Sequence, residues 1–146
     1  MNLYRNKFEI CIRAVILNKG KILVCWNKKK GYYFFPGGHL EFSEKIGDAL
    51  VREIKEELNV GVKKFDFVGI VDNVFTEDGE KHHEINFVFN VKLDKCNIFS
   101  QEDHIDFHWK TLKEFKKEKV LPIALKNKTI SWLKTKKTFW GSGGDK

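Results

Sequence analysis

The stretch FFPGGHLEFSEKIGDALVREIKEELNV, residues 34–60, decides how the rest of the chain is interpreted. The pair Gly37 and Gly38 follows a proline at the end of an aromatic segment, and glycine can hold backbone conformations that are closed to other residues. The pair therefore predicts that another group approaches the backbone closely. Ser43 precedes an apolar run at helical spacing, which predicts a helix that is capped by Ser43 and ends near Asn59.

This predicted helix gathers carboxylates, although the whole chain carries 27 Lys+Arg against 20 Asp+Glu. On a helical wheel, Glu53, Glu56 and Glu57 border the apolar stripe and do not lie opposite to it. The residues of the stripe are Leu50, Val51, Ile54 and Leu58.

Such crowding of glutamates is unfavourable in a helix. Like charges one turn apart repel by roughly a few tenths of a kcal/mol per pair. The negative end of the helix dipole disfavours Glu56 and Glu57 by roughly 0.3–1 kcal/mol each. A divalent cation would reverse both costs, and carboxylate oxygens suit hard ions such as Mg²⁺ or Mn²⁺ better than zinc. We interpret the helix as a metal platform, against the alternative of ordinary surface glutamates.

The spacing of the stretch is specific. Five residues separate Gly38 from Glu44, and seven separate Glu44 from the run Arg52-Glu53-Ile54-Lys55-Glu56-Glu57. This pattern resembles the box of the Nudix hydrolase family over residues 38–60, with Asn59 in place of the usual Gly. Asn tolerates the left-handed conformation better than other residues that have a side chain. The resemblance implies an α/β fold of the Nudix type, an α/β/α sandwich with a mixed β-sheet.

The same resemblance implies the ligands of the metal. Glu53, Glu56 and Glu57 would bind divalent ions together with a backbone carbonyl of Gly37 or Gly38. Mg²⁺ is the expected ion, and Mn²⁺ is the alternative. The bound metal would lower the pKa of a water molecule that attacks phosphorus.

Further roles follow from the resemblance. Glu44 and Arg52 would orient the loop and the helix. A further carboxylate is expected after the box, where we prefer Glu102 to Asp103 as the general base or as an extra ligand. Either of the last two glutamates of the helix could serve as the base instead.

Several residues are candidates for contacts with the substrate. His39, beside the glycine pair, is a candidate for a phosphate contact, and Arg13 and Glu41 are candidates for contacts with a second phosphate or a ribose. Stacking on a base is weighed, against a place in the core, for the aromatic residues Phe35, Phe87 and Trp109.

Regular structure is predicted on both sides of the box. Strands are predicted at FEICIRAVIL, KILVCW, YYFF, VKKFDFVGIVDNVF, HEINFVFNVKL and IDFHW, and a closing helix at LPIALKNKTISWL. With 146 residues of which 42% are hydrophobic, the chain can bury one sizeable core. We predict a single domain over residues 1–134 and a basic, flexible tail over residues 135–146.

Charge and cysteine usage restrict the partners. The net charge of +7 favours an anionic partner such as a nucleotide, whereas the Lys runs alone leave nucleic acid open without favouring it. No apolar run approaches the roughly 20 residues of a membrane span, so we predict no membrane partner and a cytoplasmic location. Cys11, Cys25 and Cys96 predict free thiols. A homodimer through exposed strand edges is left open.

The identity of the substrate lies outside the box. The resemblance implies a nucleoside diphosphate linked to another group, and PGGHLEFSE looks like the corresponding segment of MutT-like members that cleave nucleoside triphosphates. A nucleoside triphosphate is therefore the first choice. ADP-ribose or a nucleotide sugar is the close alternative, and 5′-triphosphate RNA is a third. A nucleotide sensor without catalysis is the alternative from a different functional class.

Overall fold

The computed structural model describes residues 7–98 and 105–144 of the chain. Its strands and helices, in chain order, are β1 (Phe8–Asn18), β2 (Lys21–Asn27), β3 (Tyr32–Phe34), β4 (Gly37–His39), α1 (Ile46–Leu58), β5 (Val62–Glu77), β6 (Glu80–Leu93), β7 (Ile105–Thr111), α2 (Leu112–Lys117), β8 (Val120–Leu121), α3 (Ile123–Thr135) and β9 (Phe139–Gly144).

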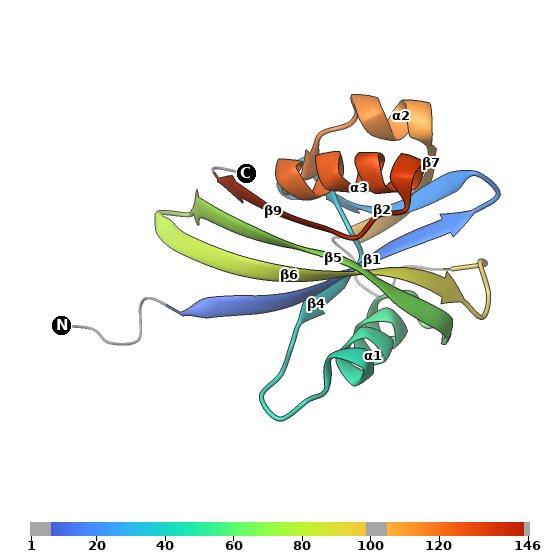
Figure 1. The fold of residues 1–146 in the computed structure, drawn as a ribbon, viewed down its shortest axis with the longest axis horizontal. Coiled ribbons are helices and arrows are strands. Elements are labelled where there is room, and N and C mark those ends of the chain that lie inside the picture. Colours follow the sequence, from blue (N-terminus) through green and yellow to red (C-terminus); the bar gives the residue numbers. More distant parts are fainter. Residues whose placement is uncertain (1–6, 99–104, 145–146) are drawn as a thin grey trace.

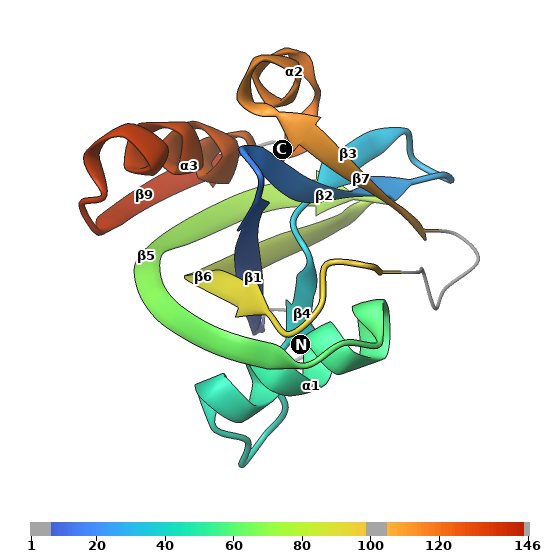
Figure 2. The ribbon, with the colours of Figure 1, turned by 90° about the vertical axis from the view of Figure 1, so that its right-hand side faces the viewer.

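The strands form one mixed sheet in the order β8-β3-β2-β1-β6-β5-β9, with β4 added to β1 and β7 added to β2. The pair β1–β6 is parallel, whereas the long hairpin β5–β6 is antiparallel. Helix α1 lies on one side of the sheet, and α2 and α3 lie on the other side (Figures 1 and 2). The predicted α/β class with a mixed sheet between helices is confirmed.

Each side of the sheet has its own hydrophobic core, because successive side chains of a strand point to opposite faces. Ile12 and Ala14 of β1 pack on the α1 side. Val15, from the alternate set of β1, packs on the other side with Leu125 and Trp132 of α3. Strand β1 is therefore buried on both faces, and its position in the middle of the molecule is what places β4 and α1 beside each other.

Helix α1 differs from the sequence prediction at its start and in its buried stripe. The cap residue is Lys45, without a side-chain hydrogen bond, because Ser43 has a φ of 67° and a cap requires an extended backbone. Val51 is exposed, and Ala49 takes its place in the stripe. The stripe is turned toward Glu57, whose carboxylate is held by the backbone of β4. The helix ends at Asn59, as predicted, in the left-handed conformation.

The end of the chain is more ordered than the sequence predicted. The expectation of a frayed tail is wrong for residues 139–144, which form β9 in parallel with β5, from the pair Gly69 and Phe139 to the pair Val74 and Gly144. Strand β9 pairs with the backbone at the edge of β5, and such pairing requires no periodic pattern of apolar residues in the sequence. The division of the chain at residue 134 stays a prediction.

Three short elements were also missed, namely β4, α2 and β8. Helix α2 carries a readable signal, since Thr111 and Glu114 form a capping box at its start. Strand β8 has two residues and pairs with β3. Too short for a periodic pattern, it could not be found from the sequence.

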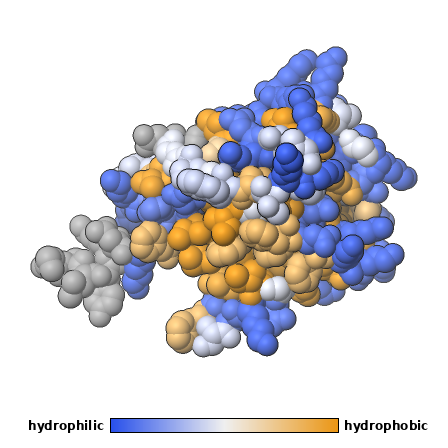
Figure 3. All heavy atoms as spheres, viewed as in Figure 1, coloured by the Kyte–Doolittle hydropathy of each residue, from blue (hydrophilic) through white to orange (hydrophobic). Residues whose placement is uncertain are grey.

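The exposed surface bears on the predicted homodimer, and the state of the cysteines and the length of the helices bear on the predicted thiols and the predicted absence of a membrane span. A hydrophobic band crosses the middle of the face viewed in Figure 3. Phe67 of β5 and Trp140 of β9 are among the exposed large hydrophobic residues of the protein. The homodimer stays a prediction. Cys11 and Cys25 are buried and form no disulfide bond within the described residues. Along the described ranges, no helix is long and apolar enough to cross a membrane.

Candidate active site

The two glycines of β4 bring α1 against the sheet. The Gly37 N–H donates a hydrogen bond of 3.2 Å to Oε2 of Glu57, a carboxylate that is 8% exposed. A Cβ atom at Gly37 would overlap the carbonyl of Ile12, and the φ of 143° at Gly37 is itself unfavourable for other residues. A Cβ atom at Gly38 would overlap the carboxylate of Glu53. The close approach that the glycine pair predicted is thus made by β1 and by a side chain of α1.

Arg52 ties the loop before α1 to the helix. Its guanidinium donates to both carboxylate oxygens of Glu44, from Nε at 2.6 Å and from Nη2 at 2.9 Å. Nη2 also donates to the carbonyl of His39 at 3.1 Å. These hydrogen bonds raise the pKa of Arg52 and lower the pKa of Glu44. Such bidentate pairs fix geometry as well as charge, so Arg52 and Glu44 set the path of the loop.

The same guanidinium contacts two of the predicted metal ligands. Nη1 of Arg52 lies 2.9 Å from Oε1 of Glu53 and 3.2 Å from Oε2 of Glu56. The side chain of Glu53 is 13% exposed, whereas that of Glu56 is 57% exposed. A cationic nitrogen therefore already bridges the two carboxylates. Glu57 reaches the platform from the other side, through its bond to Gly37.

These donors fit a divalent cation in their chemistry. They are carboxylate oxygens next to a glycine backbone, the ligands that hard ions prefer. As the side chains stand, no group of three His, Cys, Asp or Glu residues in the described ranges is close enough to hold a metal ion. The structure therefore brings the three glutamates to one end of the β4–α1 unit, where the Arg52 guanidinium contacts Glu53 and Glu56.

The other residues predicted for the site are more scattered. His39 has a side chain that is 63% exposed, and its Nε2 lies 3.7 Å from Oε1 of Glu9. Glu41 lies in the exposed loop, with its Oε1 3.9 Å from Nη1 of Arg52. Glu102 lies outside the described residues, so its role stays a prediction.

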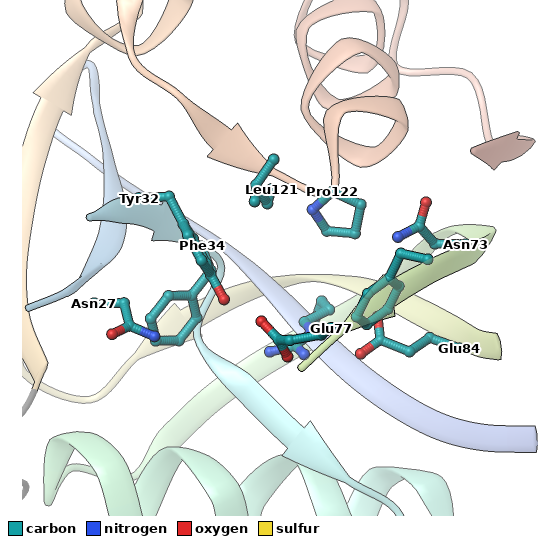
Figure 4. Close-up of a pocket in the computed structure, with 10 residues that line it drawn as sticks. Asn27, Tyr32, Phe34, Asn73, Glu77, Glu84, Leu121 and Pro122 are labelled. Carbon is teal, nitrogen blue, oxygen red and sulfur yellow. The ribbon is translucent and has the colours of Figure 1, made fainter. Parts of the chain in front are cut away.

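Arg13 belongs to a separate cavity of about 220 Å³ on the α3 side of the sheet (Figure 4). Arg13 is held there by two hydrogen bonds, from Nη1 to the Phe35 carbonyl at 3.2 Å and from Nε to Oδ1 of Asn86 at 3.3 Å. The residues that line the cavity are Arg13, Asn27, Tyr32, Phe34, Asn73, Phe75, Glu77, Glu84, Leu121 and Pro122.

Arg13 connects this cavity with the carboxylate platform. It is the register partner of Gly37 across β1 and β4. It also interacts electrostatically with Glu84, which lines the cavity, and with Glu57 of α1. The cavity and the platform are therefore neighbours across one backbone pair, and a ligand in the cavity could extend toward the glutamates.

Aromatic residues do line the cavity, but they are not the ones named from the sequence. Phe35 is fully buried in the core on the α3 side, and Phe87 and Trp109 pack against the core on the α1 side. The cavity is lined by Tyr32 and Phe34 of β3 and by Phe75 of β5. The YYFF segment before the glycine pair was a usable signal for the first two, whereas Phe75 comes from a remote strand.

Comparisons with known proteins agree with this geometry. A family model described as the NUDIX domain matches residues 7–133. An 8-oxo-dGTP diphosphatase of Buchnera aphidicola subsp. Schizaphis graminum is 26% identical over 114 residues, which cover 75% of this chain and 82% of that protein. An ADP-ribose pyrophosphatase of Methanocaldococcus jannaschii is 31% identical over 83 residues, which cover 55% of this chain and 48% of that protein.

A solved structure shows the same fold. The MutT protein of Methanosarcina mazei Go1 superposes with a TM-score of 0.75 at 22% identity. The match covers 91% of this chain and 98% of that chain.

Proposed function

The chain belongs to the Nudix family, and from that premise we propose that its substrate is a nucleoside triphosphate, cleaved by attack of water on phosphorus. It is a hydrolase that acts on pyrophosphate bonds. Nudix hydrolases generally need a divalent metal, and we propose Mg²⁺ here, with Mn²⁺ as a substitute. A cytoplasmic location is part of the proposal, since buried cysteines that form no disulfide bond within the described residues fit a reducing compartment.

The observation that carries the proposal is the pairing of a carboxylate platform with a small cavity through Arg13. At about 220 Å³, the cavity is smaller than the roughly 300–1,000 Å³ of sites that enclose a whole drug-sized ligand. It therefore suits a base, with the sugar and the phosphates leaving it toward the platform. Arg13 is placed to contact the chain of phosphates on that path.

Each residue of the platform has a proposed role. Glu53, Glu56 and Glu57 would hold the metal together with a carbonyl of Gly37 or Gly38. When bound, the metal lowers the pKa of the attacking water and offsets the charge of the phosphate oxygens.

The surrounding residues keep this platform in place and handle the proton. Arg52 and Glu44 hold the loop against α1 through their bidentate contact. Glu56 or Glu57 accepts the proton of the water, unless Glu102 from the later loop does so. Because the two oxygens of a carboxylate lie in one rigid plane, the Gly37 N–H that holds one oxygen of Glu57 also orients the second.

ADP-ribose is the second candidate substrate. It is favoured by the likeness to the ADP-ribose pyrophosphatase of Methanocaldococcus jannaschii, which includes 31% identity over 83 residues. The two reactions release different products, pyrophosphate from a triphosphate and two monophosphates from ADP-ribose.

A panel of substrates tests the proposal. Product release is measured from nucleoside triphosphates, ADP-ribose and 5′-triphosphate RNA, with Mg²⁺, with Mn²⁺ and with a chelator. We expect pyrophosphate from triphosphates only when metal is present. Turnover of ADP-ribose alone would contradict a nucleoside triphosphate as the substrate. Turnover in the presence of the chelator would contradict the requirement for a metal. Absence of turnover with every substrate, while the same ligands raise the melting temperature, would indicate a sensor.

A further inference from the structure

Asn73 is a buried polar residue whose side chain forms no hydrogen bond with the described part of the chain. It lies on β5, is 3% exposed and lines the cavity beside Pro122 (Figure 4). Among the described residues, none forms a hydrogen bond with its amide. Buried amides are nearly always hydrogen-bonded, so an amide that lacks a partner at a cavity wall indicates a group that a ligand satisfies.

Glu84 lies next to Asn73 and is half-buried. The two residues are register partners across β5 and β6, so their side chains are neighbours on one face of the sheet. Glu84 forms no hydrogen bond or ion pair within the described ranges. Glu77, the other carboxylate of the cavity, instead has its Oε1 2.7 Å from Nζ of Lys30. The cavity thus presents an amide and a carboxylate side by side, neither of them hydrogen-bonded to the described part of the chain, with the Arg13 cation as the electrostatic neighbour of Glu84.

The rest of the cavity suits a flat ring. Tyr32 and Phe34 come from β3, and Phe75 comes from β5. Aromatic faces stack on bases without regard to which base is present. The choice among bases therefore falls to the polar pair, Asn73 and Glu84.

We propose that Asn73 and Glu84 read the base of the substrate and select guanine, an inference that rests on the proposed nucleoside triphosphate hydrolysis. A carboxylate can only accept hydrogen bonds, whereas an amide can also donate. Guanine places two donors, N1–H and the N2 amino group, beside one acceptor, O6. Glu84 can accept from both donors while Asn73 donates to O6.

Other bases do not match this pair. Adenine presents its N1 lone pair beside the N6 amino group, and that lone pair would face the carboxylate. Cytosine and uracil each place an acceptor next to their single donor group. A buried site built for hydrogen bonds rejects a ligand that leaves those groups unpaired. Oxidation of guanine at C8 leaves N1, N2 and O6 in place as donors and acceptor, so the pair reads guanine and its C8-oxidised form alike.

Steady-state kinetics of the whole chain test the inference. We compare kcat/KM for dGTP, dITP and dATP in the wild type, in Glu84→Gln and in the matched control Glu80→Gln, an exposed glutamate of the same strand that lies outside the cavity. We expect the wild type to favour dGTP over dATP at least about tenfold, with dITP between them because it lacks the N2 amino group. Glu84→Gln is expected to remove most of this preference, and Glu80→Gln to leave it unchanged.

Several outcomes would overturn the inference. One is equal use of dGTP and dATP by the wild type, and another is an equal loss for both substrates in Glu84→Gln. Asn73→Ser supplies an independent variant, expected to lower kcat/KM for dGTP more than for dATP, and its melting temperature shows whether it folds. A Glu84→Gln variant that loses 8-oxo-dGTP turnover but keeps dGTP turnover would also contradict the assignment of Glu84 to N1–H and the N2 amino group, because both bases carry these donors.

Binding measurements separate this inference from the proposed function. Titration calorimetry with GMP and AMP needs no hydrolysis, and we expect GMP to bind more tightly. Guanine-selective binding without turnover of any triphosphate would overturn the proposed function and keep the base-reading pair. Turnover of triphosphates without tighter binding of GMP than of AMP would keep the proposed function and overturn the base-reading pair.

Discussion

The carboxylate platform and the cavity are built in opposite ways. The platform uses β4, α1 and the loop between them, so that its residues lie close in the sequence, with Gly37 hydrogen-bonded to Glu57 and Arg52 hydrogen-bonded to Glu53. The cavity draws residues from β1, β2, β3, β5, β6, β8 and the start of α3. Chemistry that needs fixed ligands is thus encoded locally, whereas the choice of substrate is encoded by the way distant strands are brought together.

The largest effect is expected at the platform, from Glu57→Gln. The variant keeps an oxygen that can accept the Gly37 N–H, so the fold should remain, but it removes a charge that the metal requires. Metal catalysis supplies several kcal/mol, so we expect kcat to fall about a thousandfold. The measurement is steady-state turnover of the preferred triphosphate, with circular dichroism to check the fold.

Asp48→Asn is the matched control for that variant. Asp48 is an exposed carboxylate of the same helix that takes no part in the platform. We expect its turnover to equal that of the wild type. Full activity in Glu57→Gln, or an equal loss in both variants, would break the distinction between a catalytic face and an ordinary helix surface.

The local nature of the platform explains what the sequence could predict. The spacing from Gly38 to Glu57 predicted the helix, and the glycine pair predicted the close approach, because most contacts there join residues within one loop–helix unit; the exception is the approach of Gly37 to Ile12 of β1. It did not predict the orientation of α1, since the exposure of Val51 depends on how Glu57 docks on β4.

The cavity shows why the remainder could not be predicted. Asn73 and Glu84 come together only through the register of β5 and β6, and an isolated Asn or Glu in a strand has no distinguishing pattern. Arg13 was named from the sequence, but for a phosphate or a ribose without a location. Strand β9 was missed for the same reason, because its partner β5 lies about half the chain away.

A smaller effect on the platform is expected from Gly38→Ala. The new Cβ would occupy the place of the Glu53 carboxylate and force that side chain to move. Misplacement by about 1 Å can cost roughly a hundredfold, so we expect kcat to fall between about tenfold and a hundredfold. The metal concentration for half-maximal activity should rise as well.

Gly47→Ala controls for the simple addition of a methyl group. Its Cβ would meet only the tip of the Phe65 ring, at 3.0 Å, and Phe65 is partly exposed and able to yield. Alanine also favours the helix by up to about 1 kcal/mol. We expect unchanged turnover and equal or greater stability, and loss of activity here would mean that any crowding near α1 is harmful.

On the cavity side, Gly143→Ala should alter selectivity and leave catalysis intact. A Cβ at Gly143 would lie 2.8 Å from Oδ1 of Asn73 and 2.8 Å from Cβ of Ala124, so the amide must shift. Weakening one hydrogen bond by about 1 kcal/mol changes the dGTP preference by about fivefold. Gly141→Ala on the same strand would meet only the flexible end of Lys128 and should keep the preference.

The smallest effect is expected at Asn59, where the box departs from its usual glycine. Asn59 ends α1 with a φ of 55°, and its N–H donates to the carbonyl of Lys55 at 3.0 Å. A left-handed residue with a side chain costs roughly 1–2 kcal/mol, less for Asn and least for Gly. We expect Asn59→Ala to lower the free energy of unfolding by about 1 kcal/mol and Asn59→Gly to raise it slightly.

Denaturant unfolding measures these changes, and turnover measured alongside shows whether they reach the platform. The carboxylates are fixed by Gly37 and Arg52 and not by the C-terminal turn, so kcat should stay within about twofold in both variants. A large fall in kcat for Asn59→Ala with little change in stability would show that this turn positions the ligands. The set of residues that position the metal ligands would then include the C-terminal turn of α1.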